Sequence, residues 1–250
     1  MEERYLKRND VNLHYVVSGT GDPIIMLHGN GEDLHVFDEL AGALSRSYRV
    51  IRMDSRGHGK SILRAKIKEL NFQQFCGDIF ALMDAEKTGK AVLLGFSDGA
   101  NAALAAAADS PDRICAVVAI SGNMNPSGLK TPVLVFFDLE FAFFTALEWL
   151  ARTKRIHERI LNKKMQVGLL TGHPRITAGD LSKISMPVLL LTGKRDLIRP
   201  QHSEWIHANI PLARLIFVKN AGHFDVFKRT AEYAGYITDF LTNVKAGQVV

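Results

Sequence analysis

The stretch of sequence that decides the fold class is AVLLGFSDGANAALAAAAD, residues 91–109. An apolar run, Ala91–Leu94, leads directly into Gly95-Phe96-Ser97-Asp98-Gly99 and then into an alanine-rich segment. Such a run is typical of a strand buried on both faces, and alanine favours a helix. A serine at this kind of turn adopts strained backbone geometry, and the flanking glycines leave room for it. The pattern predicts an exposed serine hydroxyl at a strand end, beside a helix N-terminus where negative charge is favoured.

The same alternation of apolar run, turn and helical segment recurs along the chain. The apolar runs are Pro23–Leu27, Val50–Met53, Ala91–Leu94, Ile114–Ile120, Pro187–Leu191 and Leu215–Val218. The helical candidates are Leu34–Leu44, Phe72–Glu86, Asp98–Asp109, Gln201–Asn209 and Asp225–Leu241. Alternation of this kind predicts an α/β fold, with a mostly parallel sheet of about eight strands and helices on both faces. Tyr5–Lys7 and Asn12–Val17 are expected to form an antiparallel pair that leads into it.

Composition places the chain among ordinary folded proteins. Its 250 residues are 47% hydrophobic and 23% charged, which excludes disordered and fibrous classes. A length near 250 residues suits one α/β domain, 1–250, and a chain of this size needs no disulfide or structural metal. Two lone cysteines, Cys76 and Cys115, fit a reducing compartment and provide neither a disulfide framework nor a zinc site.

Charge and hydropathy exclude several classes of partner. A net charge of +5 is modest for this length and does not indicate nucleic acid. The N-terminal segment is charged throughout, and the apolar stretch Pro132–Leu150 is interrupted by three acids, so neither a signal peptide nor a membrane span is expected. No metal-ligand spacing, GxGxxG or P-loop occurs, so we expect no metal and no cofactor. These features predict a cytoplasmic protein that acts on a small molecule.

The alternation lapses between about residues 124 and 180, where we expect a small helical cap inserted into the domain. This segment is first aromatic and then basic. An apolar cap above a serine nucleophile commonly lines the acyl pocket, and Phe141, Phe144 and Trp149 are the predicted lining residues. Half of the aromatic run is expected to be cap core instead. The basic segment Arg152–Lys164 has helical apolar spacing, which favours a solvated basic face over a membrane-surface site.

A serine nucleophile needs a base and a carboxylate. His223 follows the last apolar run in Asn220-Ala221-Gly222-His223-Phe224, and Asp196 follows the run before it in Gly193-Lys194-Arg195-Asp196. Ser97, Asp196 and His223 all follow strand ends, where an open α/β sheet places its active site. Asp225 competes with Asp196 as the acid but is expected to cap the last helix.

Two backbone N–H groups are needed to bind the oxyanion. The first is that of Asp98, directly after the nucleophile. The second is assigned to Asn30, in the loop His28-Gly29-Asn30-Gly31 after the third strand. His28 and His58 lie in glycine-rich turns and are expected to order those loops. The Asp98 side chain has two readings: a carboxylate in the first turn of a helix, or a partner for a cationic substrate group such as the α-amino group of an aminoacyl ester.

On these motifs the chain resembles the α/β-hydrolase superfamily. The resemblance runs from HGNG at 28–31 through DSRGHGKS at 54–61 to GFSDG, GKRD and AGHF, and it covers nearly the whole chain apart from the cap. Within the superfamily, GFSDGAN most resembles the serine esterase-like branch that includes valacyclovir-hydrolase-type enzymes. The resemblance implies the same triad and oxyanion residues, and it implies a structural role for the loop at 54–61.

The function expected from the sequence is hydrolysis of a small carboxylic ester by acyl transfer to water. A carbon–carbon bond hydrolase or an enol-lactone hydrolase would use the same triad. A non-catalytic ligand-binding protein on this fold is the alternative of another class. The acyl chain, the leaving group and the oligomeric state are left open.

Overall fold

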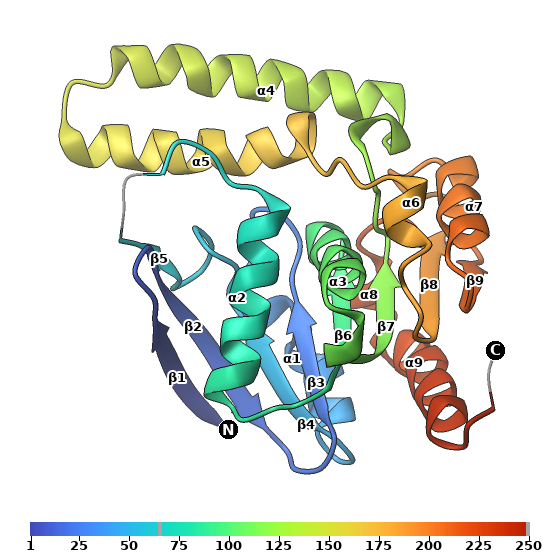
Figure 1. The fold of residues 1–250 in the computed structure, drawn as a ribbon. Coiled ribbons are helices and arrows are strands. Elements are labelled where there is room, and N and C mark those ends of the chain that lie inside the picture. Colours follow the sequence, from blue (N-terminus) through green and yellow to red (C-terminus); the bar gives the residue numbers. More distant parts are fainter. Residues whose placement is uncertain (65–66, 249–250) are drawn as a thin grey trace.

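The computed structural model describes residues 1–64 and 67–248, which fold around one twisted sheet (Figure 1). Its strands are β1 (Glu2–Lys7), β2 (Val11–Ser18), β3 (Pro23–Leu27), β4 (Arg49–Met53), β5 (Ile62–Leu63), β6 (Ala91–Phe96), β7 (Ile114–Ile120), β8 (Val188–Gly193) and β9 (Ala213–Val218). The strand order is β1-β2-β4-β3-β6-β7-β8-β9, and β5 pairs with β2. The pairs of β2 are antiparallel, and the remaining pairs are parallel. The predicted α/β fold class is confirmed, with the two-residue β5 as an unexpected addition.

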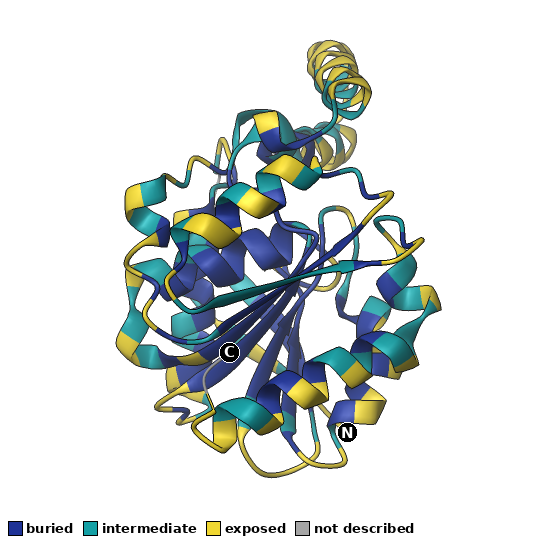
Figure 2. Cartoon of the chain, turned by 90° about the vertical axis from the view of Figure 1, so that its right-hand side faces the viewer, coloured by how far each residue is buried: buried dark blue, intermediate teal, exposed yellow. Residues whose placement is uncertain are grey.

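Helices cover both faces of the sheet. They are α1 (Asp38–Leu44), α2 (Phe72–Ala85), α3 (Asp98–Asp109), α4 (Thr131–Leu150), α5 (Lys154–Gly172), α6 (Ala178–Leu181), α7 (Pro200–Asn209), α8 (Asp225–Lys228) and α9 (Thr230–Lys245). Successive strand residues point to opposite faces, so each strand contributes to two cores. In β3, Ile25 packs with α2 and α3, whereas Ile24 packs with α1 and α9. Figure 2 shows the buried strands enclosed between these helices.

Two predicted helices are divided in the structure. The segment expected as one helix from Leu34 to Leu44 is a 3-10 helix at Leu34–Phe37 followed by α1. The segment expected as a single helix from Asp225 to Leu241 is α8 followed by α9, because Arg229 leaves helical geometry at φ −119° and ψ 38°. The Arg229 guanidinium donates 2.9 Å to the carbonyl oxygen of Lys219 in the loop after β9. That contact ties the break to the loop that carries His223.

The loop after β4 is held by the buried carboxylate of Asp54. It accepts hydrogen bonds of 2.8 Å from the backbone N–H groups of Leu34 and Lys60, and it contacts the His14 ring at 2.7 Å. The next residue, Ser55, donates its N–H to Nε2 of His28 at 2.9 Å. The DSRGHGKS loop therefore supports the chain that runs from β3 into His28-Gly29-Asn30.

Helices α4 and α5 form an antiparallel hairpin above the carboxyl ends of the parallel strands (Figure 1). They lie with α6 inside the segment expected as a cap. Helix α5 faces the sheet domain, burying Met165, Val167 and Leu169, whereas α4 lies on its far side and contains no buried residue. Over the described ranges, no helix is both long enough and apolar enough to cross a membrane.

Candidate active site

Ser97 lies at the sharp turn between β6 and α3. Its backbone has φ +52° and ψ −118°, a left-handed geometry that costs energy in any residue with a side chain. The two glycines are required by contact: a Cβ on Gly95 would overlap the carbonyl oxygen of Gly99, and a Cβ on Gly99 would overlap that of Leu27. The serine N–H donates 2.8 Å to the carbonyl oxygen of Ile120 on the neighbouring strand. The turn predicted from the GFSDG motif is thus present at the carboxyl edge of the sheet.

The structure brings His223 and Asp196 to this serine. Nε2 of His223 lies 3.2 Å from Oγ of Ser97, and Nδ1 of His223 lies 2.6 Å from Oδ1 of Asp196. Asp196 is 1% exposed. Burial alone would raise the pKa of its carboxyl, but hydrogen bonds from His223 and Ser121 outweigh burial and hold the pKa below its usual range. The carboxylate is therefore kept ionised beside the imidazole.

The Asp225 carboxylate, the competing candidate for the acid, contacts a different group. Its Oδ2 accepts a hydrogen bond of 2.9 Å from the N–H of Gly222, and the residue opens α8. The predicted cap of the last helix is wrong: Asp225 lies in the first turn of the short α8, that helix has no side-chain capping bond, and the carboxylate bonds to the preceding loop instead. It has no hydrogen bond to His223 among the residues that the structure describes.

Ser121, which was not predicted as a site residue, holds the second oxygen of Asp196. Oγ of Ser121 donates 2.6 Å to Oδ2 of Asp196, and Ser121 is itself in a left-handed conformation at φ +56°. It directly follows β7, at the same edge of the sheet as the other three side chains. The rule that selected those residues, a polar side chain just after an apolar run, also applies to Ser121 and could have found it.

The loop with Asn30 lies beside the helix start at Asp98, as expected for two oxyanion donors. The Asn30 side chain donates 2.8 Å to Oδ2 of Asp98 and 2.7 Å to the carbonyl oxygen of Gln166 on α5. The N–H at the start of a helix has no partner within the helix. Neither this N–H nor that of Asn30 has a protein acceptor over residues 1–64 and 67–248. Neither group is engaged elsewhere in the described chain, and their role as oxyanion donors stays a prediction.

The Asp98 carboxylate, in contrast, is not free to meet a substrate. It is 6% exposed, it accepts from Asn30 and, at 3.1 Å, from Nδ2 of Asn101, and it does not line the cavity at Ser97. Burial raises its pKa to about 6, although the two amide hydrogen bonds oppose the rise. The predicted contact with a substrate cation is thus replaced by a contact that orders the oxyanion loop.

A second carboxylate, Glu32, does reach the cavity and was not predicted. Its Oε2 accepts 2.9 Å from the N–H of Gly29, within the same loop. Burial raises its pKa to about 7, against the opposing effects of the Gly29 hydrogen bond and the nearby His223. In the sequence, a glutamate directly after HGNG cannot be distinguished from a surface acid, because only the fold of the loop turns its side chain into the cavity.

A cavity of about 250 Å³ opens onto Ser97 and His223. Its apolar lining comes from both the sheet domain and the cap: Phe96, Leu129, Phe137, Val167, Leu170, Leu197 and Phe224. Its charged lining residues are Glu32, Glu140 and Lys163, and Asn30, Asn123 and Gln166 add polar groups.

The three aromatic residues predicted to line the pocket do not line this cavity. Phe141 packs on Gly168 of α5 and under the ammonium group of Lys164, and Phe144 is half-buried beside Phe143. Trp149 is 87% exposed. The reason is that α5 stands between most of α4 and the sheet, so that only the N-terminal half of α4 reaches the cavity, through Phe137 and Glu140.

Known proteins similar to this chain identify its family. A family model described as alpha/beta hydrolase fold matches residues 22–155. The chain therefore belongs to the α/β-hydrolase family, and the resemblance recognised in its motifs is confirmed. It is 24% identical over 240 residues to a pimeloyl-[acyl-carrier protein] methyl ester esterase of Nitrosomonas europaea, covering 85% of this chain and 92% of that protein. It is 26% identical over 259 residues to serine hydrolase BPHL of Homo sapiens, covering 93% and 84%.

Solved structures give the same class. An enol-lactonase from Burkholderia xenovorans superposes with a TM-score of 0.76 at 25% identity, covering 96% of this chain and all of that one. A carboxylesterase from Bacillus subtilis, at 22% identity, shares the fold with a TM-score of 0.78 and coverage of 96% and 91%. The protein is an enzyme, a hydrolase of the esterase-like kind.

Proposed function

We propose that the protein hydrolyses small carboxylic esters by acyl transfer through Ser97, His223 and Asp196. The observation that carries the proposal is the hydrogen-bonded chain from Ser97 Oγ to His223 Nε2 and from His223 Nδ1 to Asp196 Oδ1, at 3.2 and 2.6 Å. This is the arrangement that converts a serine hydroxyl into a nucleophile, because the imidazole accepts the proton and the carboxylate stabilises the imidazolium that results.

In the acylation step Ser97 Oγ attacks the ester carbonyl carbon, and its proton passes to Nε2 of His223. The carbonyl π electrons move to oxygen, and the N–H groups of Asn30 and Asp98 bind the resulting oxyanion. Collapse expels the alcohol, which takes the proton from His223. A water molecule then repeats the sequence on the acyl-serine, so that the products are the carboxylic acid, the alcohol and the free enzyme.

The cavity favours a small substrate. Its volume of about 250 Å³ lies just below the range of about 300–1,000 Å³ typical of sites for drug-sized ligands. Apolar side chains form much of the wall, which suits a short acyl group. Phe224, which is 51% exposed, is one of these apolar lining residues.

The direct test is hydrolysis of p-nitrophenyl acetate and p-nitrophenyl butyrate. We expect turnover by the parent protein, loss of turnover in Ser97→Ala, and no change in Ser182→Ala, whose side chain is exposed and hydrogen-bonds only to the carbonyl oxygen of Gly179. A burst of one p-nitrophenol per enzyme would report the acyl-serine. A parent protein that binds esters without cleaving them would support the ligand-binding alternative instead.

A carbon–carbon bond hydrolase or an enol-lactonase would place a different substrate on the same residues. The similarity to an enol-lactonase supports keeping this second candidate. A panel of matched esters, enol lactones and β-diketones, compared by kcat/KM, separates the two. We expect the esters to give the highest values, and a lactone or diketone preference of more than about 10²-fold would reassign the substrate.

A further inference from the structure

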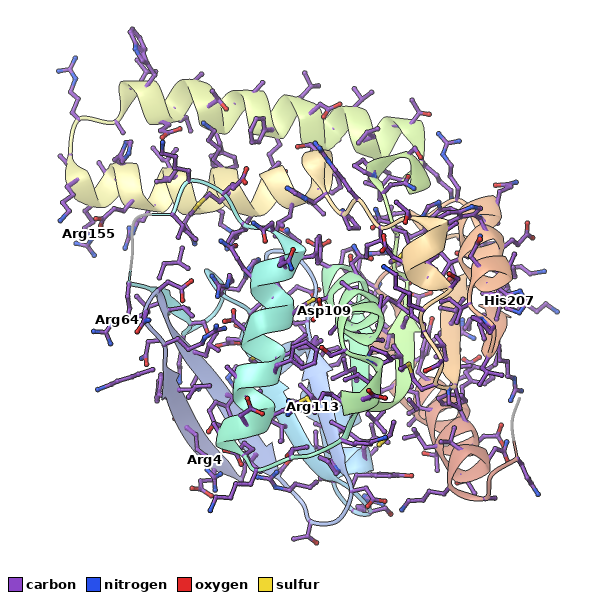
Figure 3. The ribbon with its side chains drawn as sticks, in the orientation of Figure 1. Arg4, Arg64, Asp109, Arg113, Arg155 and His207 are labelled. Atoms are coloured by element: carbon purple, nitrogen blue, oxygen red, sulfur yellow. The ribbon has the colours of Figure 1, made fainter. Side chains whose placement is uncertain are left out.

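The outer face of α4 is an apolar stripe that nothing in the described chain covers. Six large side chains on this face are each at least half exposed: Val135 (50%), Phe136 (60%), Leu139 (67%), Phe143 (58%), Trp149 (87%) and Leu150 (60%). Ala142 and Ala146, also exposed, complete the stripe. Figure 1 shows α4 as the outermost layer of the molecule, with α5 between it and the sheet. In Figure 3 the side chains of its upper surface project away from the rest of the chain.

The stripe is continuous along the helix. Val135, Leu139, Ala142, Ala146 and Trp149 are spaced by four, three, four and three residues. This is the spacing of a seam that packs against another helix. The opposite face already has its partner, since residues such as Phe141 pack on α5. Helix α4 is therefore apolar on both sides but partnered on only one.

The exposed area is that of an interface. Taking about 150–250 Å² for a whole aromatic side chain, the six exposed fractions amount to an apolar surface on the order of 600 Å². Monomeric proteins rarely expose more than about 300–600 Å² in one patch, and a standard interface buries about 800 Å² on each partner. The stripe with its polar margin thus supplies the area that a stable dimer requires.

We propose that the stripe pairs with the same stripe of a second copy of this chain, with the two α4 helices antiparallel and crossing at Ala142. A two-fold interface must be self-complementary: if one residue contacts another, the reverse contact also occurs. Antiparallel pairing centred on Ala142 places alanine on alanine at the crossing point, where small side chains let helices approach closely. It also places Val135 opposite Trp149 of the other copy and Leu139 opposite the small residues Thr145 and Ala146, so that in each of these pairs a larger side chain meets a smaller one. The two hairpins then form a four-helix bundle.

Charge favours a protein partner over a lipid surface. Helix α4 contains three acids, Asp138, Glu140 and Glu148, and no lysine or arginine. Membrane-surface helices carry Lys and Arg beside their apolar face, which α4 lacks. The basic residues of the cap belong to α5 and to the far end of the hairpin, where Figure 3 shows Arg155. Pairing also leaves the catalytic cavity open, because Phe137 and Glu140 reach it from the other face of α4.

The first test measures mass in solution. Sedimentation velocity of the full-length protein between 1 and 100 µM should show a dimer, and Ala142→Glu and Leu139→Glu should each shift it to a monomer. Ile62→Glu is the matched control, because Ile62 is 65% exposed but lies on β5, far from the stripe. Ester hydrolysis verifies that each variant is folded. A parent protein that stays monomeric at 100 µM, or a dimer that survives both α4 substitutions, overturns the proposal.

The second test fixes the geometry of the pair. Exposed Cys115 is first replaced by serine, since it would form disulfides of its own. In that background Ala142→Cys should give a disulfide-linked dimer on mild oxidation, whereas Thr145→Cys, at the margin of the stripe, should give at least tenfold less. Equal crosslinking at both positions contradicts a crossing at Ala142. The monomer is also tested for flotation with vesicles of phosphatidylcholine and phosphatidylserine. If it floats, and if Leu139→Glu abolishes flotation, the stripe binds a membrane surface and the pairing is overturned.

Discussion

Asn30 and Asp98 are joined by a hydrogen bond of 2.8 Å between the Asn30 amide and the Asp98 carboxylate, although 68 residues separate them. Each of these residues also carries one of the backbone N–H groups proposed to bind the oxyanion. The same amide reaches the carbonyl oxygen of Gln166 on α5 at 2.7 Å. The side chains thus hold the two N–H donors at a fixed separation and tie both to the cap.

Asp98→Asn should therefore impair catalysis without affecting substrate binding. The carboxylate accepts from both Asn30 and Asn101, and an amide in its place turns one of its two acceptors into a donor. We expect kcat on p-nitrophenyl acetate to fall about 10–10²-fold with little change in KM, because the oxyanion donors lose their alignment. Unchanged turnover of simple esters, with loss of activity on α-aminoacyl esters alone, would restore the direct substrate contact predicted from the sequence.

The triad substitutions should differ from that of the neighbouring acid. Ser97→Ala and His223→Ala are each expected to lower kcat by about 10⁴-fold or more, and Asp196→Asn by about 10³–10⁴-fold, because the residues act as a unit. Asp225→Asn should stay within about threefold of the parent, since its carboxylate contacts Gly222 and not His223. Steady-state kinetics on one p-nitrophenyl ester measures all four. A larger loss in Asp225→Asn than in Asp196→Asn would reverse the choice of acid.

Ser121→Ala should remove a hydrogen bond to Asp196 and thereby lower kcat. The Ser121 hydroxyl donates 2.6 Å to Oδ2 of the buried Asp196 carboxylate. Removing the hydroxyl therefore takes this donor away from Oδ2. A loss of about 1.5–3 kcal/mol, typical of a hydrogen bond to a charged group, corresponds to about a 10–150-fold lower kcat. Steady-state kinetics on p-nitrophenyl acetate measures this, and a kcat equal to that of the parent would show that Ser121 does not support Asp196 in catalysis.

Glu32 should make stability depend on pH. Burial raises its pKa from 4.5 to about 7, so the folded state binds this proton more tightly than the unfolded state, and the contribution of Glu32 to stability falls as pH rises from about 4.5 to 7. Glu32→Gln keeps an acceptor for the N–H of Gly29 but removes the charge. It should be more stable than the parent by about 1–2 kcal/mol at pH 8 and equal to it near pH 4.5. Urea unfolding at both values measures this, and a difference independent of pH would contradict it.

Asp78 and Arg56 form a buried bidentate ion pair, and we expect a large loss of stability when Asp78 is removed. Arg56 is 1% exposed, Asp78 is fully buried, and the two contacts measure 2.7 Å. Asp78→Ala should reduce the free energy of unfolding by as much as about 3–5 kcal/mol, because the buried guanidinium loses its bidentate partner and keeps the single contact with the part-exposed Asp10 at 2.7 Å. Asp239→Ala, which breaks the exposed pair with Arg214, is the control and should cost under about 1 kcal/mol. Similar losses in both variants would refute the role of burial.

The sequence by itself determined the class of fold and the candidates for chemistry. Continuous apolar runs such as Ile114–Ile120 are readable because a strand buried on both faces needs them, and they became strands. Ser97, Asp196 and His223 could be selected together because parallel strands end at one edge of a sheet, so that residues distant in the chain meet there. The turn at Ser97 was readable for a local reason, since only glycine fits at positions 95 and 99.

The tertiary structure alone decided what surrounds these residues. Which aromatic side chains of the cap face the cavity depends on how α4 lies on α5, and no spacing within the run distinguishes Phe137, which reaches the cavity, from Phe141, which does not. Asp98 and Glu32 are both acids in glycine-rich turns, and only the packing of the loops turns one toward Asn30 and the other into the cavity. Local patterns record which residues form an element, whereas the partner of a side chain is set by contacts between elements that are far apart in the chain.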